Sequence, residues 1–226
     1  MSPARSRDPL WRAIVSNMSI LKFVLIVGTG LLAGGCSKRT VSISVDLPEK
    51  TATAPRLDVP TLASALRDED ADVRFAATID LAGYKDKAAP AAESLGKLLK
   101  DPSANLRSAA ADTLGLIGPA SAPTTYLLGE ALADQSPDVR RSAAVALGRI
   151  GEGAGPAVGP LSKAVLDFDE EVRLAAIDAL GKIGPPARSA VAVLLRAMQD
   201  GDEVKRRRAE QSIQQIDPAA IARGPG

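Results

Sequence analysis

An aspartate followed six residues later by an arginine recurs along this sequence, and a carboxylate beside a guanidinium could act as a catalytic pair. The pair occurs five times, at Asp68 and Arg74, Asp101 and Arg107, Asp134 and Arg140, Asp167 and Arg173, and Asp200 and Arg206. No enzyme needs five identical sites. The repetition therefore favours a structural role for these residues.

Other chemistry is limited by what the composition lacks. The 226-residue chain contains no histidine, which removes the commonest general base and the commonest metal ligand. Its single cysteine, Cys36, can form neither an internal disulfide nor a cysteine-rich zinc site. The formal net charge of +1 provides no global field that would recruit nucleic acid. We therefore expect no catalytic residues, no cofactor, no metal site and no nucleic-acid partner.

Three further patterns fit structure better than chemistry. Gly115, Gly148 and Gly181 recur inside predicted helices, where a small residue allows close helix approach rather than phosphate binding. The stretch GEGAGPAVG at 151–159 lacks the preceding strand and the spacing of a dinucleotide-binding loop. The basic run KRRR at 205–208 is most simply a solvated cap, and contact with anionic lipid is the alternative.

The elements that position the Asp and Arg pairs repeat every 33 residues. Apolar or small residues recur at i, i+4, i+8 and i+11 in the first four copies, and in the fifth at all of these positions except the first, and they form one face of an α-helix. Residues suited to an N-cap begin each helix, and glycine ends three of them. The N-cap residues are Asp70, Ser103, Ser136, Asp169 and Asp202, and the terminating glycines are Gly118, Gly151 and Gly184.

A second helix fits between the copies, because a second leucine-rich column recurs with the same period. Each unit is therefore helix A, a tight turn that carries the aspartate, helix B and a Gly/Pro turn. We expect helix A at about 58–67, 88–100, 121–133, 154–166 and 187–199. We expect helix B at about 70–84, 103–117, 136–150, 169–183 and 202–216.

The unit DQSPDVRRSAAVALGRIG at 134–151 resembles the short HEAT repeat, in the HEAT-like form of the phycobilisome lyases. The resemblance covers residues 58–217 and implies an all-α fold, a right-handed α-solenoid of five two-helix repeats with a 33-residue period. It also implies a structural ladder, in which each turn aspartate accepts from backbone amides and from the arginine of an adjacent repeat. Lys205 in an apolar column and Arg208 in a small-residue column depart from the pattern, as suits a terminal repeat that faces water.

The N-terminus is typical of an export signal. Basic residues precede an uncharged apolar stretch at 23–35, which is too short to span a bilayer as a helix. The sequence LLAGGC at 31–36 resembles the lipobox of bacterial lipoproteins, which implies cleavage before Cys36 and lipidation of that cysteine. Met18 is an alternative start, and an uncleaved anchor is the competing interpretation. The signal implies export across the inner membrane and a lipid anchor at the periplasmic face, and by resemblance to Gram-negative lipoproteins Ser37 favours the outer membrane.

These observations divide the chain into four parts. Residues 1–35 form the lipoprotein signal peptide, 36–56 the lipidated cysteine and an extended linker, 57–217 the repeats, and 218–226 a flexible tail. We expect the five repeats at about 57–85, 86–118, 119–151, 152–184 and 185–217.

The function must lie on the surface of the solenoid. Columns of helix B beside the apolar stripe vary while the core columns repeat, and these positions should line the concave side. The candidate partner-binding residues are Phe75, Ile79, Ser108, Asp112, Leu116, Arg141, Val145, Arg149, Leu174, Asp178, Lys182, Arg207 and Gln211. Exposed apolar residues among them favour a protein or peptide partner.

We therefore expect a non-catalytic protein–protein interaction scaffold that the lipid anchors in the bacterial cell envelope. Two alternatives stay open at this stage. One is an accessory subunit of a lyase-like or other enzyme complex. The other is a purely structural spacer in the envelope.

Overall fold

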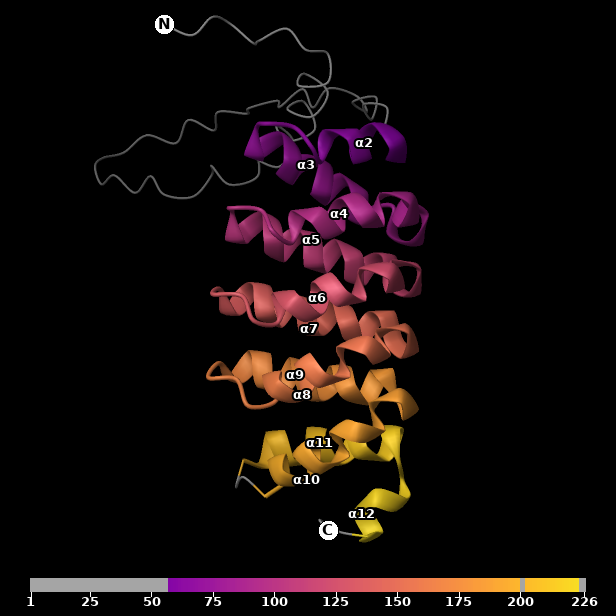
Figure 1. The fold of residues 1–226 in the computed structure, drawn as a ribbon, viewed down its shortest axis with the longest axis vertical. Helices are drawn as coiled ribbons and strands as arrows, with labels where there is room; N and C mark the ends of the chain where they lie inside the picture. The colour runs from indigo at the N-terminus through magenta and orange to yellow at the C-terminus, as the bar shows by residue number, and fades with distance from the viewer. Residues whose placement is uncertain (1–56, 200–201, 224–226) are drawn as a thin grey trace, which may run out of the picture. The chain divides into compact units, whose positions relative to one another are not determined.

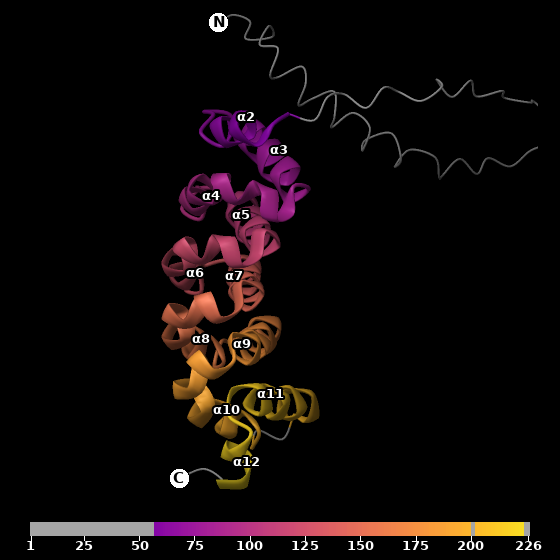
Figure 2. The same ribbon diagram turned by 90° about the vertical axis from the view of Figure 1, so that its right-hand side faces the viewer.

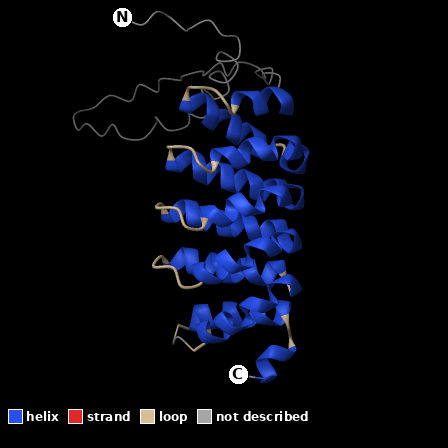
Figure 3. Cartoon of the chain, in the orientation of Figure 1, coloured by secondary structure: helices blue, strands red, loops and turns tan. Residues whose placement is uncertain are grey.

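The computed structural model describes residues 57–199 and 202–223. The expected signal peptide at 1–35, and Cys36 with its linker up to residue 56, lie outside the described residues. Every regular element in the described ranges is helical, and these helices belong to one unit, Asp58–Gly226 (Figures 1 and 3). The all-α solenoid expected from the repeat is confirmed, and its right-handed sense stays a prediction.

Five long helices correspond to the predicted B helices. They are α3 (Ala71–Ala82), α5 (Ala104–Ile117), α7 (Pro137–Ile150), α9 (Glu170–Ile183) and α11 (Glu203–Ile216). Each begins one residue after the predicted start, because the prediction included the N-cap. Successive members pack directly on one another and form one layer of the unit (Figure 2).

The A helices form the second layer and are shorter than predicted. They are α2 (Val59–Ala65), α4 (Ala92–Leu98), α6 (Thr125–Ala131), α8 (Val158–Ala164) and α10 (Val191–Ala197). The last four follow 3-10 segments: η1 (Lys85–Ala91), η2 (Gly118–Thr124), η3 (Gly151–Ala157) and η4 (Pro185–Ala190). Pro90, Pro123 and Pro156 lie inside the first three segments. A proline cannot donate the α-helical hydrogen bond, so the α-helix begins only after it.

The starts of the B helices are confirmed, but two caps work differently from our expectation. Asp70, Asp169 and Asp202 accept first-turn amides with their carboxylates. Ser103 and Ser136 occupy the N-cap position without a side-chain cap bond. Their own amides donate to the aspartate two residues earlier, at 2.9 and 2.8 Å, so that aspartate fixes the turn instead.

Glycine ends α5, α7 and α9, as predicted. Gly118, Gly151 and Gly184 adopt φ of +72°, +72° and +73°, a region that side chains disfavour. The equivalent residue of the first repeat is Lys85, which adopts φ of +50°. This backbone conformation costs a residue with a side chain about 1 kcal/mol. The first repeat therefore carries local strain that the others avoid.

Neighbouring B helices approach closely through the glycine column. A Cβ on Gly115 would lie 2.9 Å from the Cα of Ala146, and a Cβ on Gly148 would lie 3.0 Å from the Cα of Ala179. Real Cβ atoms essentially never lie at the first distance and are rarely as close as the second, so glycine favours the close packing of α5 on α7 and of α7 on α9. The sequence interpretation of these glycines as packing residues agrees with this geometry.

The C-terminal end differs from the expected flexible tail. Residues Ala219–Arg223 form α12, which packs on α11 and buries Ala220. The start of α12 is held by Asp217, whose Oδ1 accepts from the amide of Ala219 at 3.2 Å and whose Oδ2 pairs with Arg188 at 3.3 Å. Lys205, expected at a water-facing end, is buried because it takes the inward position of the apolar column.

Candidate protein-interaction surface

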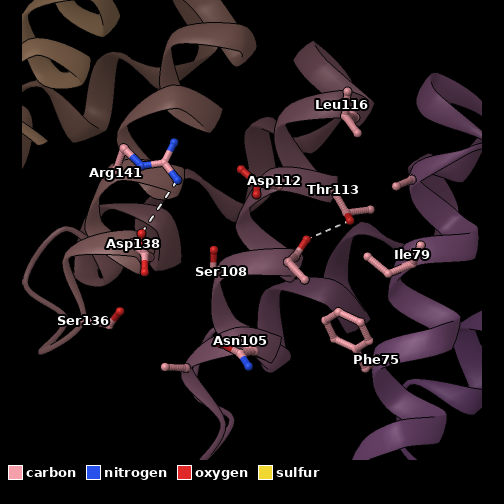
Figure 4. A pocket seen from close by; sticks show the side chains of 13 residues that line it. Phe75, Ile79, Asn105, Ser108, Asp112, Thr113, Leu116, Ser136, Asp138 and Arg141 are labelled. Carbon is pink, nitrogen blue, oxygen red and sulfur yellow. Dashed lines mark hydrogen bonds and ion pairs between the residues drawn. The ribbon is translucent and has the colours of Figure 1, made fainter. Parts of the chain in front are cut away.

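A hollow of about 430 Å³ lies on the exposed face of the first three B helices. Figure 4 shows Phe75 and Ile79 from α3, Leu116 from α5 and Arg141 from α7 around it. Phe75, Ile79 and Leu116 are 36%, 50% and 40% exposed although each is large and apolar. We call these three residues with the space between them the apolar hollow. Exposed apolar side chains that gather on one surface are typical of protein-interaction sites.

Polar groups line the opposite side of this hollow (Figure 4). Asp112 of α5 is exposed and has no ion-pair partner among the described residues. Arg141 lies 3.8 Å from the carboxylate of Asp138, one turn earlier on α7. The hydroxyls of Ser108 and Ser142 lie 3.1 Å apart and join α5 to α7. The hollow therefore has an apolar side, and its opposite rim carries side chains of both charge signs.

Two cations continue the same face beyond the hollow. Arg149 of α7 and Lys182 of α9 are exposed, and neither has an ion-pair partner in the part of the chain that the structure describes. Their Cδ atoms lie 3.3 Å from where a Cβ would sit on Gly115 and Gly148 of the preceding repeat. Each aliphatic stem thus lies across a glycine. Leu116, Arg149 and Lys182 occupy equivalent positions in consecutive repeats, and we call them the 116–149–182 column.

Among the remaining candidate residues, one expectation is wrong. Leu174 was expected to be exposed, but it is 7% exposed. Helix α9 packs between α7 and α11, and these neighbours cover Leu174 at the border of the exposed face. Arg141 occupies the equivalent position one repeat earlier, and its longer side chain reaches solvent. Val145 is half-buried and Gln211 is exposed, and neither lines the hollow.

The three arginines of the basic run in the last repeat pair with acidic residues of the same unit. Arg206 and Arg207 both pair with Glu203, with Nε–carboxylate distances of 3.0 and 2.6 Å. Arg208 reaches back to α9 and pairs with Asp178 at 2.5 Å. Asp178 and Arg207 are therefore engaged within the protein, which makes them poorer candidates for partner contact than Arg149 and Lys182.

The Asp and Arg pairs connect consecutive repeats along the edge where loops join the A and B layers (Figure 3). Arg107 donates from Nε and Nη2 to both oxygens of Asp134, at 2.7 and 2.8 Å. Arg140 makes the same two bonds to Asp167, at 2.8 Å each. In the first repeat, Arg74 donates from Nε to the Oδ2 of Asp101 at 3.0 Å.

Each of these arginines also fixes the turn of its own repeat. The Nη1 of Arg140 donates to the carbonyl oxygens of Asp134 and Gln135, at 2.9 and 3.3 Å. The Oδ1 of Asp134 accepts from the amide of Ser136 at 2.8 Å. One arginine thereby satisfies two turn carbonyls and one carboxylate of the next repeat, which accounts for its recurrence.

The electrostatics of the ladder oppose proton transfer. The Arg107 guanidinium lowers the pKa of Asp134, and the Arg140 guanidinium lowers the pKa of Asp167, in each case mainly through the hydrogen bonds between them. The same bonds raise the pKa of both arginines. A general base needs a pKa near the working pH, whereas these shifts hold both partners in their charged forms.

The two ends of the ladder differ from its middle. Asp68 is exposed and accepts at 2.8 Å from the amide two residues later. Arg173 donates to two carbonyls of its own turn at 2.9 Å, and Asp200 lies outside the described residues. Arg206 was expected to join the ladder but pairs with Glu203 on its own helix, because α12 rather than another A–B pair follows α11.

Sequence reasoning missed three exposed apolar residues outside the B-helix face. Phe168 is fully exposed and Leu166 is 69% exposed, and both flank Asp167 in the turn of the fourth repeat. Tyr126 on α6 is 72% exposed. The sequence does distinguish Phe168, because the equivalent positions of the second and third repeats are Pro102 and Gln135. A large apolar residue in this turn therefore departs from the pattern of the other repeats.

The described residues contain neither a cluster of potential metal ligands nor a helix suited to crossing a membrane. No group of three or more His, Cys, Asp or Glu side chains in these ranges is placed to hold a metal ion. None of the described helices combines the length and the apolar character needed to cross a bilayer.

Stacked helix pairs, a fixed period and an inter-repeat ladder define the chain as an all-helical repeat protein with a scaffold fold suited to protein binding. The sequence profile of HEAT repeats matches residues 59–128 and 125–214. The chain belongs to the HEAT repeat family.

Solved structures with the same architecture support this assignment of fold. An engineered protein matches with a TM-score of 0.59 at 24% identity, covering 71% of this chain and 79% of its own. A designed armadillo repeat protein in complex with the peptide (KR)4 matches with a TM-score of 0.58 at 18% identity, covering 70% of this chain and 82% of its own. A chain from the complex of CpcE and CpcF of phycocyanin lyase from Nostoc sp. PCC7120 matches with a TM-score of 0.58 at 23% identity, covering 76% of this chain and 69% of its own. The search of curated proteins found no match.

Proposed function

We propose that this protein is a non-catalytic scaffold that binds a protein or peptide partner on the exposed face of its B helices. The observation that carries the proposal is the apolar hollow, where three large apolar side chains stay exposed beside charged groups. The designed armadillo protein that shares the architecture was solved with a bound peptide, which supports the use of such a fold for peptide binding. The likeness to phycocyanin lyase subunits, at 23% identity, concerns the fold and gives no reason to propose lyase activity.

A double substitution in the hollow tests this proposal against a purely structural spacer. Ile79→Glu with Leu116→Glu places two charges on exposed positions, so we expect the fold to persist and partner recovery in affinity purification to fall about tenfold. Ala192→Glu, on the exposed side of α10 in the other layer, is the matched control. Equal recovery with the hollow variant and the control would support the spacer instead.

We also propose that the scaffold is held in the bacterial cell envelope by lipid on Cys36. The sequence LLAGGC supports this proposal, and a short apolar stretch followed by small residues favours cleavage over a membrane span. Several acyl chains anchor firmly because each buried CH2 contributes about 0.8 kcal/mol. Radiolabelled palmitate should enter the wild-type protein and not the Cys36→Ser variant, and label that persists in the variant would refute lipidation at this residue.

A further inference from the structure

We propose that the 116–149–182 column binds an extended acidic segment of the partner, with an apolar side chain of that segment in the apolar hollow and its carboxylates against Arg149 and Lys182. The inference rests on the proposed function and adds to it the chemistry of the partner. It is carried by the placement of two cations that have no ion-pair partner among the described residues.

Two acidic groups near the cationic part of the column are already engaged, whereas Asp112 at the Leu116 end has no ion-pair partner among the described residues. Asp178 pairs with Arg208, and Asp138 faces Arg141. Arg149 and Lys182 stay unpaired within the described residues, one repeat apart on the same face. Two like charges on neighbouring helices repel each other, and a partner carboxylate at each of them removes this repulsion.

The glycine column holds the two cations in place before a partner arrives. The stems of Arg149 and Lys182 lie across Gly115 and Gly148, at 3.3 Å from where a Cβ would sit. A side chain that is already confined loses less conformational entropy when it forms an ion pair. The packing glycines therefore also prepare the binding surface.

The two ends of the column limit the number of carboxylates that it can bind. Leu116 borders the apolar hollow at one end, next to the rim that includes Asp112. At the other end, the equivalent residue of the last repeat is Gln215, whose neutral side chain lies against Gly181 in the same way. The column therefore offers one apolar position followed by two cationic positions.

The spacing of the repeats fixes the spacing of the recognised residues. Packed helices lie about 8–10 Å apart, and an extended peptide advances about 3.3 Å per residue. About three peptide residues therefore span one repeat. The expected segment has an apolar residue and then acidic residues about three and about six positions away.

Fluorescence anisotropy with designed peptides tests the inference on the full chain in detergent. One labelled peptide carries leucine and two glutamates at the expected spacing in a Ser/Gly background, and matched peptides carry lysine or glutamine instead of glutamate. We expect the glutamate peptide to bind best. We expect Arg149→Glu with Lys182→Glu to weaken its binding about tenfold, because two favourable ion pairs become repulsive.

The matched control reverses two exposed cations on the other layer, Lys163→Glu on α8 with Arg196→Glu on α10. It should leave binding of the glutamate peptide unchanged. Tighter binding of the lysine peptide, equal weakening by both double variants, or no binding of the glutamate peptide would overturn the inference. The proposed function would survive each of these results if the Ile79→Glu and Leu116→Glu variant still lost its native partner.

Discussion

At the scale of the residue, Arg140 shows how a charged pair serves structure in this protein. Its guanidinium donates to two turn carbonyls and to both oxygens of Asp167, and the two side chains are only 15% and 12% exposed. Burial of this kind makes an ion pair costly to break, because the carboxylate left behind has lost its water as well as its partner.

Removal of this guanidinium should therefore destabilise the fold. We expect Arg140→Ala to lower the free energy of unfolding by about 2–4 kcal/mol, as measured by urea denaturation. Arg141→Ala removes the neighbouring exposed arginine and should change that free energy by less than about 0.5 kcal/mol. Equal effects of the two substitutions would contradict the ladder.

The same pairs predict how stability depends on pH. The folded-state pKa values of Asp134 and Asp167 lie below those of the unfolded chain, so their stabilisation is complete above the unfolded pKa of about 3.9. It is lost as the pH falls from there through the folded values. Wild-type protein should lose thermal stability in this acidic window, and Asp134→Asn with Asp167→Asn should show a flatter decline from a lower starting melting temperature. A parallel decline of both proteins would refute the assignment.

At the scale of the element, close packing decides what a glycine contributes. Alanine normally stabilises a helix relative to glycine, by about 1 kcal/mol. At Gly148, however, the new Cβ would lie 3.0 Å from the Cα of Ala179, so we expect Gly148→Ala to lower stability by about 1–3 kcal/mol. Gly159→Ala, where nothing lies within 4 Å, should raise the melting temperature slightly. Stabilisation by both substitutions would mean that α7 and α9 are not in close contact.

The end of the first B helix offers a stabilising substitution. Lys85 adopts φ of +50° at the position where the next three repeats have glycine. We expect Lys85→Gly to raise the free energy of unfolding by about 1 kcal/mol, because glycine relieves the strain. Chemical denaturation measures the change, and Lys87→Gly, in the same 3-10 segment without a positive φ, should not raise it.

The elements themselves could be predicted well because their signals are local. N-cap residues, apolar spacing and terminating glycines located the later four B helices to within a residue, and α3 ends two residues before its predicted end. The 3-10 segments were missed, although prolines lie near the predicted start of helix A. A proline shows that the α-helix is interrupted there, but the conformation of the preceding turn decides where the α-helix begins. The burial of Leu174 was missed for a related reason, because it depends on how closely the flanking helices cover α9.

At the scale of the whole molecule, the 33-residue period predicted the fold because each repeat contacts mainly its neighbours. The candidate site was predicted less completely. Six of the candidate residues line one hollow, namely Phe75, Ile79, Ser108, Asp112, Leu116 and Arg141. The remaining candidate residues lie outside the hollow, and some are buried or paired within the protein. Such pairing could not be predicted from the period, because it depends on long side chains such as Arg208, which reaches the preceding repeat and pairs with Asp178.

The central claim is that the B-helix face binds a protein partner, and site-specific photocrosslinking in native membranes tests it most directly. A photoreactive residue at Leu116 should give a defined crosslinked product, whereas the same residue at Ala192 on the other layer should not. Identical patterns from both positions, or no product at Leu116, would contradict the claim.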